Sequence, residues 1–201
     1  MTSEVPIRKP EIKRPIYAVG LFIVNVNTGL IWCVKELSSS AKTAKSAGQI
    51  SIPLETKKVN ETSIGTAIGG LEEFKALEEN DSLIYIENQV SSKGRHKYEN
   101  GNFVDFVVLG YSSNGGKGQD NLQVADPQVE GLGWFRIDDL LTRPDLRTGL
   151  RSFLELAKNE RWIENFLMEF QTNKSAKVVL TRNDPRLNYI QERIKLKDFH
   201  K

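Results

Sequence analysis

An amphipathic segment enclosed between β-rich segments constrains the fold of this chain most. Between residues 62 and 79, apolar residues recur at spacings of three and four, which places them on one stripe of a helix; they are Ile64, Ala67, Ile68, Leu71, Phe74 and Leu77. The segments before and after it are rich in β-branched and aromatic residues, a composition typical of strands. A helix with one apolar stripe between strands must bury that stripe against a sheet, so the sequence predicts an α/β fold.

Strands and loops are predicted on both sides of this helix. Residues 16–34 form two apolar runs separated by Asn27-Thr28-Gly29, a turn composition that favours a β-hairpin. Further strands are expected at 49–53, 83–90, 102–111, in the first part of 131–141 and at 177–181. Polar loops are expected at 38–48, 55–61, 91–101 and 113–120. Helical spacing returns over 151–170 and 184–196, so the carboxyl-terminal part should be mostly helical.

Composition narrows the classes of function. The formal net charge is +2 and the pI about 8.6, which is far from the strongly basic balance of a nucleic-acid-binding chain, so nucleic acid is not an expected partner. The single cysteine, Cys33, lies in an apolar run; we expect a buried thiol in a reducing compartment. No segment approaches the roughly 20 apolar residues that cross a bilayer, so we expect a cytoplasmic protein without a membrane partner.

One segment resembles a known motif. Residues 53–77, PLETKKVNETSIGTAIGGLEEFKAL, are similar to the loop-helix box of the Nudix hydrolases, G-x5-E-x7-R-E-U-x-E-E-x-G-U, in which U is a bulky apolar residue. Anchoring the box on Glu61 brings Leu71, Glu73 and Leu77 onto matching positions. The order of the predicted elements strengthens the resemblance, as does the later segment E-x-x-x-W-F-x-x-D-D-L-L at 130–141.

The resemblance implies a fold and a domain organisation. It implies an α/β/α sandwich with a mixed sheet, in which a Nudix-like domain spans 16–145. An extended arm, 1–15, precedes it because three prolines and several basic residues disfavour a helix there. The remaining residues, 146–201, are expected to form a mostly helical extension packed on that domain.

The box departs from the family pattern where the family binds its metal. In the same register its Gly falls on Glu55, its Arg on Gly69, its next Glu on Gly70 and the last of its paired Glu on Phe74. The family hydrolyses a nucleoside diphosphate linked to another moiety, using Mg²⁺ or Mn²⁺ held by carboxylates at i, i+3 and i+4 of the helix. Here only Glu73 remains of those carboxylates, so a divalent cation would be held weakly.

Carboxylates near the box are the candidates for any surviving activity. Glu73 is the candidate catalytic residue and metal ligand, with Glu72 and Glu99 as further candidate ligands. Adjacent residues of a helix project about 100° apart, so Glu72 would join Glu73 only through an irregularity of the helix. Glu99 lies in a predicted loop and is equally explained as an ordinary loop charge.

Other residues are candidate ligand contacts. Gly69 and Gly70 would leave one helix face bare, which suits either a ligand group or a closely packed element. Lys93 and Arg95 could attract a phosphate or could simply be solvated. Glu61 could contact a ligand or could stabilise the first turn of the helix, where negative charge is favourable.

The missing carboxylates decide the expected function. We expect a catalytically weak or inactive module that binds a nucleotide-type ligand or a protein partner. The alternative is a divergent Mg²⁺-dependent hydrolase that uses Glu73 with Glu72, Glu61 or Glu99. A third interpretation is an α/β domain of unrelated function, and the sequence leaves open whether the chain forms a homodimer.

Overall fold

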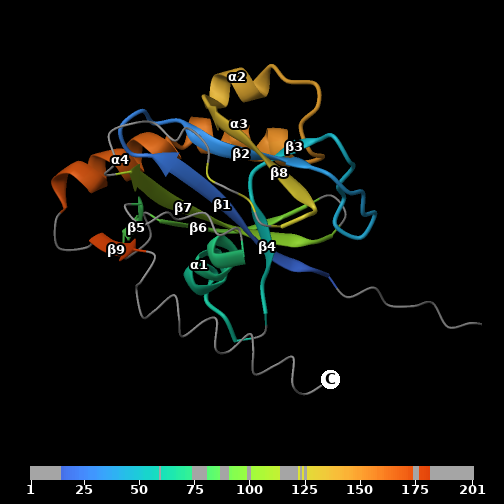
Figure 1. Cartoon of the computed structure of the whole chain (residues 1–201), viewed down its shortest axis with the longest axis horizontal. Coiled ribbons are helices and arrows are strands. Elements are labelled where there is room, and N and C mark those ends of the chain that lie inside the picture. The colour runs from blue at the N-terminus through green and yellow to red at the C-terminus, as the bar shows by residue number, and fades with distance from the viewer. Residues whose placement is uncertain are drawn as a thin grey trace, which may run out of the picture.

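The computed structural model describes residues 15–58, 60–73, 81–86, 91–98, 101–113, 122, 124, 126–173 and 177–181. In this part of the chain a mixed sheet carries helices on both of its faces (Figure 1). The predicted α/β sandwich with a mixed sheet is therefore confirmed. Three predicted segments lie outside the described residues: the arm up to residue 14, most of the loop at 113–120, and the helix at 184–196.

Within the described part of the chain, the sheet contains nine strands. They are β1 (Tyr17–Asn25), β2 (Ile31–Glu36), β3 (Ile50–Ser51), β4 (Leu54–Thr56), β5 (Asp81–Ile86), β6 (Ser92–Lys97), β7 (Phe103–Ser113), β8 (Val129–Phe135) and β9 (Lys177–Thr181). The main order is β3-β2-β1-β7-β5-β9, while β4 pairs with β1, β6 with β7 and β8 with β2. Strands β1 and β7 run parallel, and the other pairs are antiparallel.

The first two strands form the hairpin that the turn residues predict. Asn25 Oδ1 accepts hydrogen bonds from the backbone N–H groups of Asn27 (3.0 Å) and Thr28 (3.2 Å). Gly29 has a φ of +71°, a left-handed conformation that glycine adopts without steric cost. The turn therefore fixes the register, in which Val24 lies opposite Ile31.

Two predicted loops contain strands, and one predicted helix is two helices. Strand β6 lies within the segment 91–101, and β4 lies at the start of the predicted loop at 55–61. Both are short or charged strands beside a long partner, so backbone pairing rather than apolar alternation defines them. The helical segment 151–170 is interrupted at Arg161, which has a φ of +55°, a left-handed conformation that a continuous α-helix excludes.

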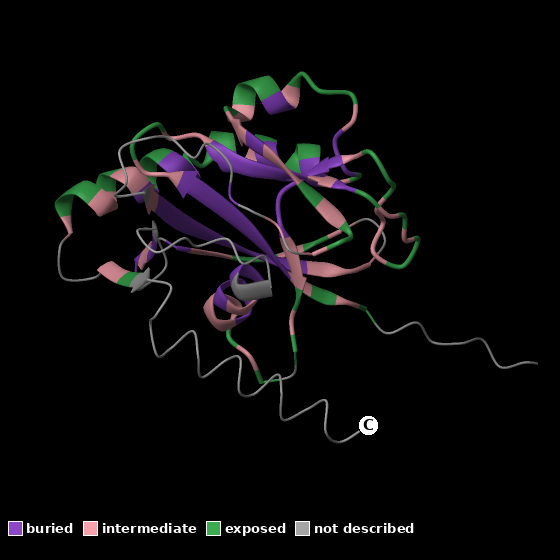
Figure 2. Ribbon diagram, viewed as in Figure 1, coloured by how far each residue is buried: buried purple, intermediate pink, exposed green. Residues whose placement is uncertain are grey.

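Among the described residues, four helices cover the two faces of the sheet (Figure 1). They are α1 (Ser63–Glu73), α2 (Ile137–Leu141), α3 (Leu150–Asn159) and α4 (Trp162–Thr172). Because side chains alternate along a strand, Leu21 and Ile23 pack with α1, whereas Phe22 and Val24 pack with α3 and α4. The central strands are consequently buried on both faces (Figure 2).

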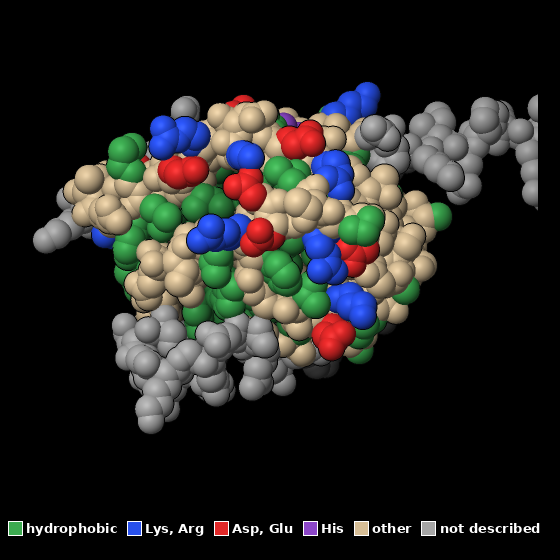
Figure 3. Space-filling model, turned by 90° about the horizontal axis from the view of Figure 1, so that it is seen from above, with side chains coloured by type: hydrophobic (Ala, Val, Ile, Leu, Met, Phe, Trp, Pro, Cys, Tyr) green, Lys and Arg blue, Asp and Glu red, His purple; other side chains and the backbone are tan. Residues whose placement is uncertain are grey.

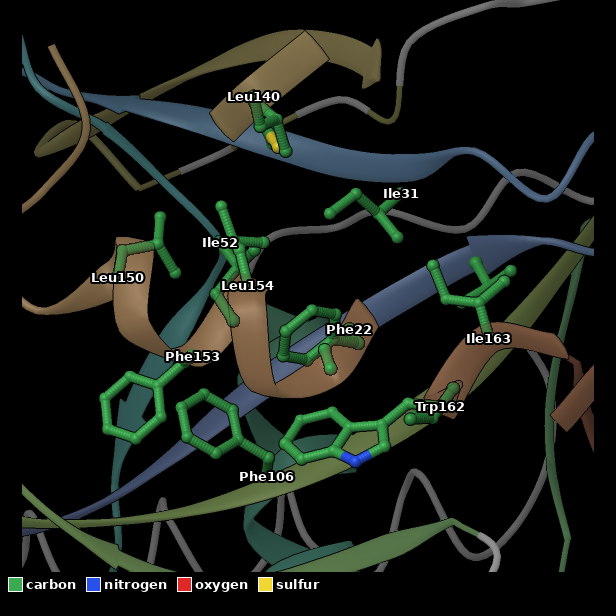
Figure 4. Packing of buried hydrophobic residues seen from close by; sticks show 14 of the residues in the cluster. Phe22, Ile31, Ile52, Phe106, Leu140, Leu150, Phe153, Leu154, Trp162 and Ile163 are labelled. Atoms are coloured by element: carbon green, nitrogen blue, oxygen red, sulfur yellow. The ribbon is translucent and has the colours of Figure 1, made fainter. Parts of the chain in front are cut away.

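Aromatic side chains fill the layer between the sheet and helices α3 and α4 (Figure 4). Phe106 of β7 lies 4.6 Å from Phe153 and 5.7 Å from Trp162 between ring centroids. Phe22 of β1 meets Trp162 edge to face at 5.3 Å. Residues from the predicted carboxyl-terminal extension thus complete the main core. Cys33 belongs to the same cluster, and burial raises the pKa of its thiol to about 12.

The outer surface of this layer carries charges of both signs. Seen from above, Lys and Arg side chains are interspersed with Asp and Glu side chains around small apolar areas (Figure 3). Arg143 pairs with Asp145, and Lys158 pairs with Asp138. Among the described helices, none combines the length and apolar character that crossing a membrane requires.

Candidate functional site

Helix α1 begins with a side-chain cap. Thr62 Oγ1 accepts the N–H of Gly65 at 3.0 Å, which satisfies one of the free donors of the first turn. Glu61 lies just before the helix, and its Oε2 accepts a hydrogen bond from the Thr66 hydroxyl (3.1 Å) and from the Lys58 N–H (3.3 Å). Glu61 thereby fastens the loop after β4 to the first turn of α1.

The two adjacent glycines lie on α1, and one of them contacts β4 closely. Gly70 is buried, whereas Gly69 is half-buried. A Cβ added at Gly70 would lie 3.2 Å from Cβ and 3.3 Å from Cγ of Glu55. The bare helix face at Gly70 is therefore packed by a side chain of this same chain.

The three predicted metal ligands, Glu99 and the side chains of Glu72 and Glu73, lie outside the described residues. The backbone of Glu73 ends helix α1 as the structure describes it.

The two predicted phosphate contacts on β6 are not brought together. The Lys93 ammonium lies 5.9 Å from the ring of Trp162, on the side of α4. Burial lowers the pKa of Lys93, and this effect outweighs the negative charge of Glu160, which raises it. The Arg95 guanidinium lies 5.0 Å from the ring of Tyr17 and pairs with Asp105. Strand β6 is irregular between Ser92 and Arg95, so the side chains of Lys93 and Arg95 lie in different surroundings.

A buried carboxylate on β7 gathers polar groups from three other segments. Asp105 Oδ2 accepts hydrogen bonds from the Ser63 hydroxyl (2.7 Å) and Lys57 Nζ (3.1 Å), and Oδ1 accepts one from Arg95 Nε (3.2 Å). Burial alone would raise the pKa of Asp105, but the bonds from Ser63, Arg95 and Lys57 outweigh it and hold the pKa below its ordinary value. This cluster ties the start of α1 to the sheet. The sequence signal for it was a single Asp inside an apolar strand.

This cluster makes stability depend on pH. Because the folded-state pKa of Asp105 is lowered, its contribution is present above the unfolded-state pKa, about 3.9, and is lost as pH falls through the folded value. We expect Asp105→Asn to be less stable than the native protein at pH 7, with a difference that shrinks below about pH 4. Urea unfolding at pH 7 and pH 3 measures this; an equal difference at both values would contradict the assignment.

A cavity of about 370 Å³ lies beside β4, on the edge of the sheet. Its walls come from β1, β2, β4 and the first residues of β7 and β8, from the loop that contains Ser40, Thr43 and Lys45, and from residues before α3. Glu55 also borders it, so the cavity adjoins the segment that packs on Gly70. Asn102 and Gln128 add amide groups, and Tyr98 adds a half-buried phenol. Burial raises the pKa of Tyr98 to about 12, although the positive charge of Arg147 acts to lower it.

Charged groups on one wall of the cavity neutralise one another. Arg147 Nη1 donates to Glu36 Oε1 at 2.9 Å, and Lys45 Nζ lies 3.3 Å from Glu36 Oε2. A second Arg147 nitrogen donates to the backbone carbonyl of Thr43, which holds the loop over the cavity. Glu36 and Arg147 are 3% and 9% exposed, so water screens this pair little. Sequence reasoning missed both residues, although Glu36 at the end of an apolar strand was a signal.

The arrangement of elements defines a known class of fold. No protein-family model matches the sequence, and a search of curated proteins gives no match either. Among solved structures, a NUDIX hydrolase from Nitrosomonas europaea is 14% identical with a TM-score of 0.50, covering 74% of this chain and 90% of that one. A MutT protein from Methanosarcina mazei Go1 is 17% identical with a TM-score of 0.51, covering 75% and 99%. The chain therefore has the Nudix fold, and the resemblance found in the sequence is confirmed at the level of the fold.

The sequence resemblance implies a divalent cation, and the described residues can be compared with what such a cation requires. Within the described part of the chain, no group of three or more His, Cys, Asp or Glu side chains is placed to hold a metal ion. The position of the family's first helix carboxylate is Gly70, and the space beside it is occupied by Glu55. Mg²⁺ and Mn²⁺ require several oxygen ligands, and the candidate ligands Glu99 and the side chains of Glu72 and Glu73 lie outside the described residues.

Proposed function

We propose that this chain is a Nudix-fold module that binds a nucleotide-type ligand and has weak or no hydrolytic activity. The observation that carries the proposal is the contrast between two neighbouring places. The cavity beside β4 is open and lined by hydroxyl, amide and phenol groups. The adjoining box face at Gly70 is instead packed by Glu55.

The charges of the cavity favour the uncharged part of such a ligand. Three carboxylates (Glu36, Glu55 and Asp126) and two cations (Lys45 and Arg147) border it, a formal net charge of −1. Both cations already pair with Glu36. A phosphate chain would gain little Coulomb attraction there, so we propose that the nucleoside part enters the cavity and the phosphates stay outside.

The test measures binding and turnover on the same samples. Thermal unfolding and phosphate release would be followed with adenosine, ADP-ribose, dinucleoside polyphosphates and nucleoside triphosphates, each with Mg²⁺ or Mn²⁺. A ligand at 100 times its Kd stabilises a protein by about 2.7 kcal/mol, which for a chain of this size is a rise in Tm of roughly 5–10 °C. We expect such a rise for at least one ligand, with no phosphate release above background.

A matched pair of variants locates the binding. Thr56 borders the cavity from β4, and Thr172 is exposed at the end of α4. Thr56→Trp should block the cavity and weaken binding at least about tenfold, equivalent to about 1.4 kcal/mol, whereas Thr172→Trp should leave binding unchanged. Equal binding by both variants would remove the cavity as the site. Absence of stabilisation by every ligand would overturn the ligand proposal, and metal-dependent turnover would overturn the proposed weak activity.

A further inference from the structure

Two departures from the Nudix box, one on β4 and one on α1, are in contact in the fold. The glycine of the box corresponds to Glu55, and the first helix carboxylate of the box corresponds to Gly70. Glu55 lies on β4 opposite Val19, and Gly70 lies on α1. In this register, a glutamate stands on the strand where the box has glycine, and a glycine stands on the helix where the box has glutamate.

The geometry couples the two positions. A Cβ on residue 70 would lie 3.2 Å from Glu55 Cβ, 3.3 Å from Cγ and 3.6 Å from Oε2. The first two distances are shorter than ordinary carbon contacts of about 3.5–4.0 Å, so a side chain at 70 and the side chain of Glu55 compete for one space. Glu55 Oε1 also accepts the N–H of Thr56 at 3.0 Å, which holds the carboxylate near its own strand.

We propose that Glu55 and Gly70 are a reciprocal exchange in which the strand glutamate fills the place of the helix carboxylate and closes the cation site of the fold. The contact between Glu55 and Gly70 thus packs the face of α1 on which the box would hold its cation. The inference concerns the box face alone, so it stands or falls independently of whether the cavity binds a nucleotide-type ligand.

The first test asks whether Gly70→Ala raises or lowers Tm. Glycine in the middle of a helix is less stable than alanine by roughly 1 kcal/mol, so Gly70→Ala should raise Tm by about 2–4 °C where space allows. We expect that rise in the Glu55→Gly background and a fall in Tm in the native background. Gly65→Ala is the control on the same helix, because Gly65 faces Thr62 rather than Glu55, and its effect should be equal in both backgrounds.

The second test asks whether the site can be reopened. Mn²⁺ binding to Gly70→Glu and to the double variant Glu55→Gly/Gly70→Glu would be measured by the electron paramagnetic resonance of free Mn²⁺. Charge alone predicts tighter binding when Glu55 is kept, because it adds a carboxylate. Reciprocal exchange predicts the opposite, and we expect the double variant to bind at least about tenfold more tightly, or about 1.4 kcal/mol.

Either measurement can overturn the proposal. If Gly70→Ala shifts Tm equally with and without Glu55, the two positions are not coupled. If Gly70→Glu binds Mn²⁺ as tightly as the double variant, Glu55 does not close the site. Should Glu55→Gly fail to fold, Glu55→Ala removes Cγ and the carboxylate but keeps Cβ, so the Mn²⁺ comparison is then made with Glu55→Ala/Gly70→Glu.

Discussion

Replacing Arg147 by methionine should lower the free energy of unfolding by about 3 kcal/mol, the lower end of the range for breaking a buried ion pair. The substitution leaves the carboxylate of Glu36 almost fully buried with Lys45 as its remaining charged neighbour. It also removes the donor to the Thr43 carbonyl, so the loop over the cavity loses an anchor. Urea unfolding monitored by circular dichroism at neutral pH measures the loss.

The chain offers a matched control for this substitution. Arg143 pairs with Asp145 at 2.9 Å, but its side chain is 44% exposed and that of its partner 40%. Exposed pairs contribute at most about 1 kcal/mol, so Arg143→Met should have a correspondingly small effect. Two variants with equal losses would show that the Glu36–Arg147 pair is not the stabilising contact that its burial indicates.

Replacing Trp162 by alanine should cost about 3–5 kcal/mol, the usual range for removing a large aromatic side chain from a core. Trp162 is 1% exposed and contacts Phe22 and Phe106 of the central strands. Its indole N–H donates to Glu160 at 2.7 Å, so the substitution also removes the hydrogen bond beside the break between α3 and α4. Thermal and urea unfolding would both report the loss.

Met168 provides the comparison on the same helix. It is 55% exposed, and substitutions at exposed sites usually change stability by no more than about 0.5 kcal/mol. A Trp162→Ala variant as stable as Met168→Ala would mean that α4 is not part of the core. The predicted large loss would instead show that the Nudix-fold domain needs residues beyond 145.

Arg147 should matter both for stability and for ligand binding. Arg147 borders the cavity and donates a hydrogen bond to Thr43 in the loop that lines it. The Arg147→Met variant should therefore also bind the proposed ligand less tightly, whereas Trp162→Ala should not affect binding at temperatures at which it is folded. This contrast separates the cavity wall from the general core.

Local patterns in the sequence determined the main elements. The turn at Asn27-Thr28-Gly29 specified the hairpin, because its residues accept the required backbone conformation. Apolar spacing specified α1 and its buried Leu71, because only one face of a helix can meet the sheet. The box register, anchored on Glu61, places Gly70 on the helix face that Glu55 contacts.

Only the tertiary structure decided which distant residues meet. Strand β6 exists because the edge of β7 offers backbone hydrogen-bond partners, and its own residues carry no apolar alternation. Asp105 gathers Lys57, Ser63 and Arg95 from three segments, and Arg147 reaches Glu36 across 111 positions. The contact between Glu55 and Gly70 belongs to the same kind, since strand pairing and helix packing, not spacing along the chain, bring the two together. A burial pattern fixes which face of an element turns inward, but the partner on that face is set by the packing of the whole domain.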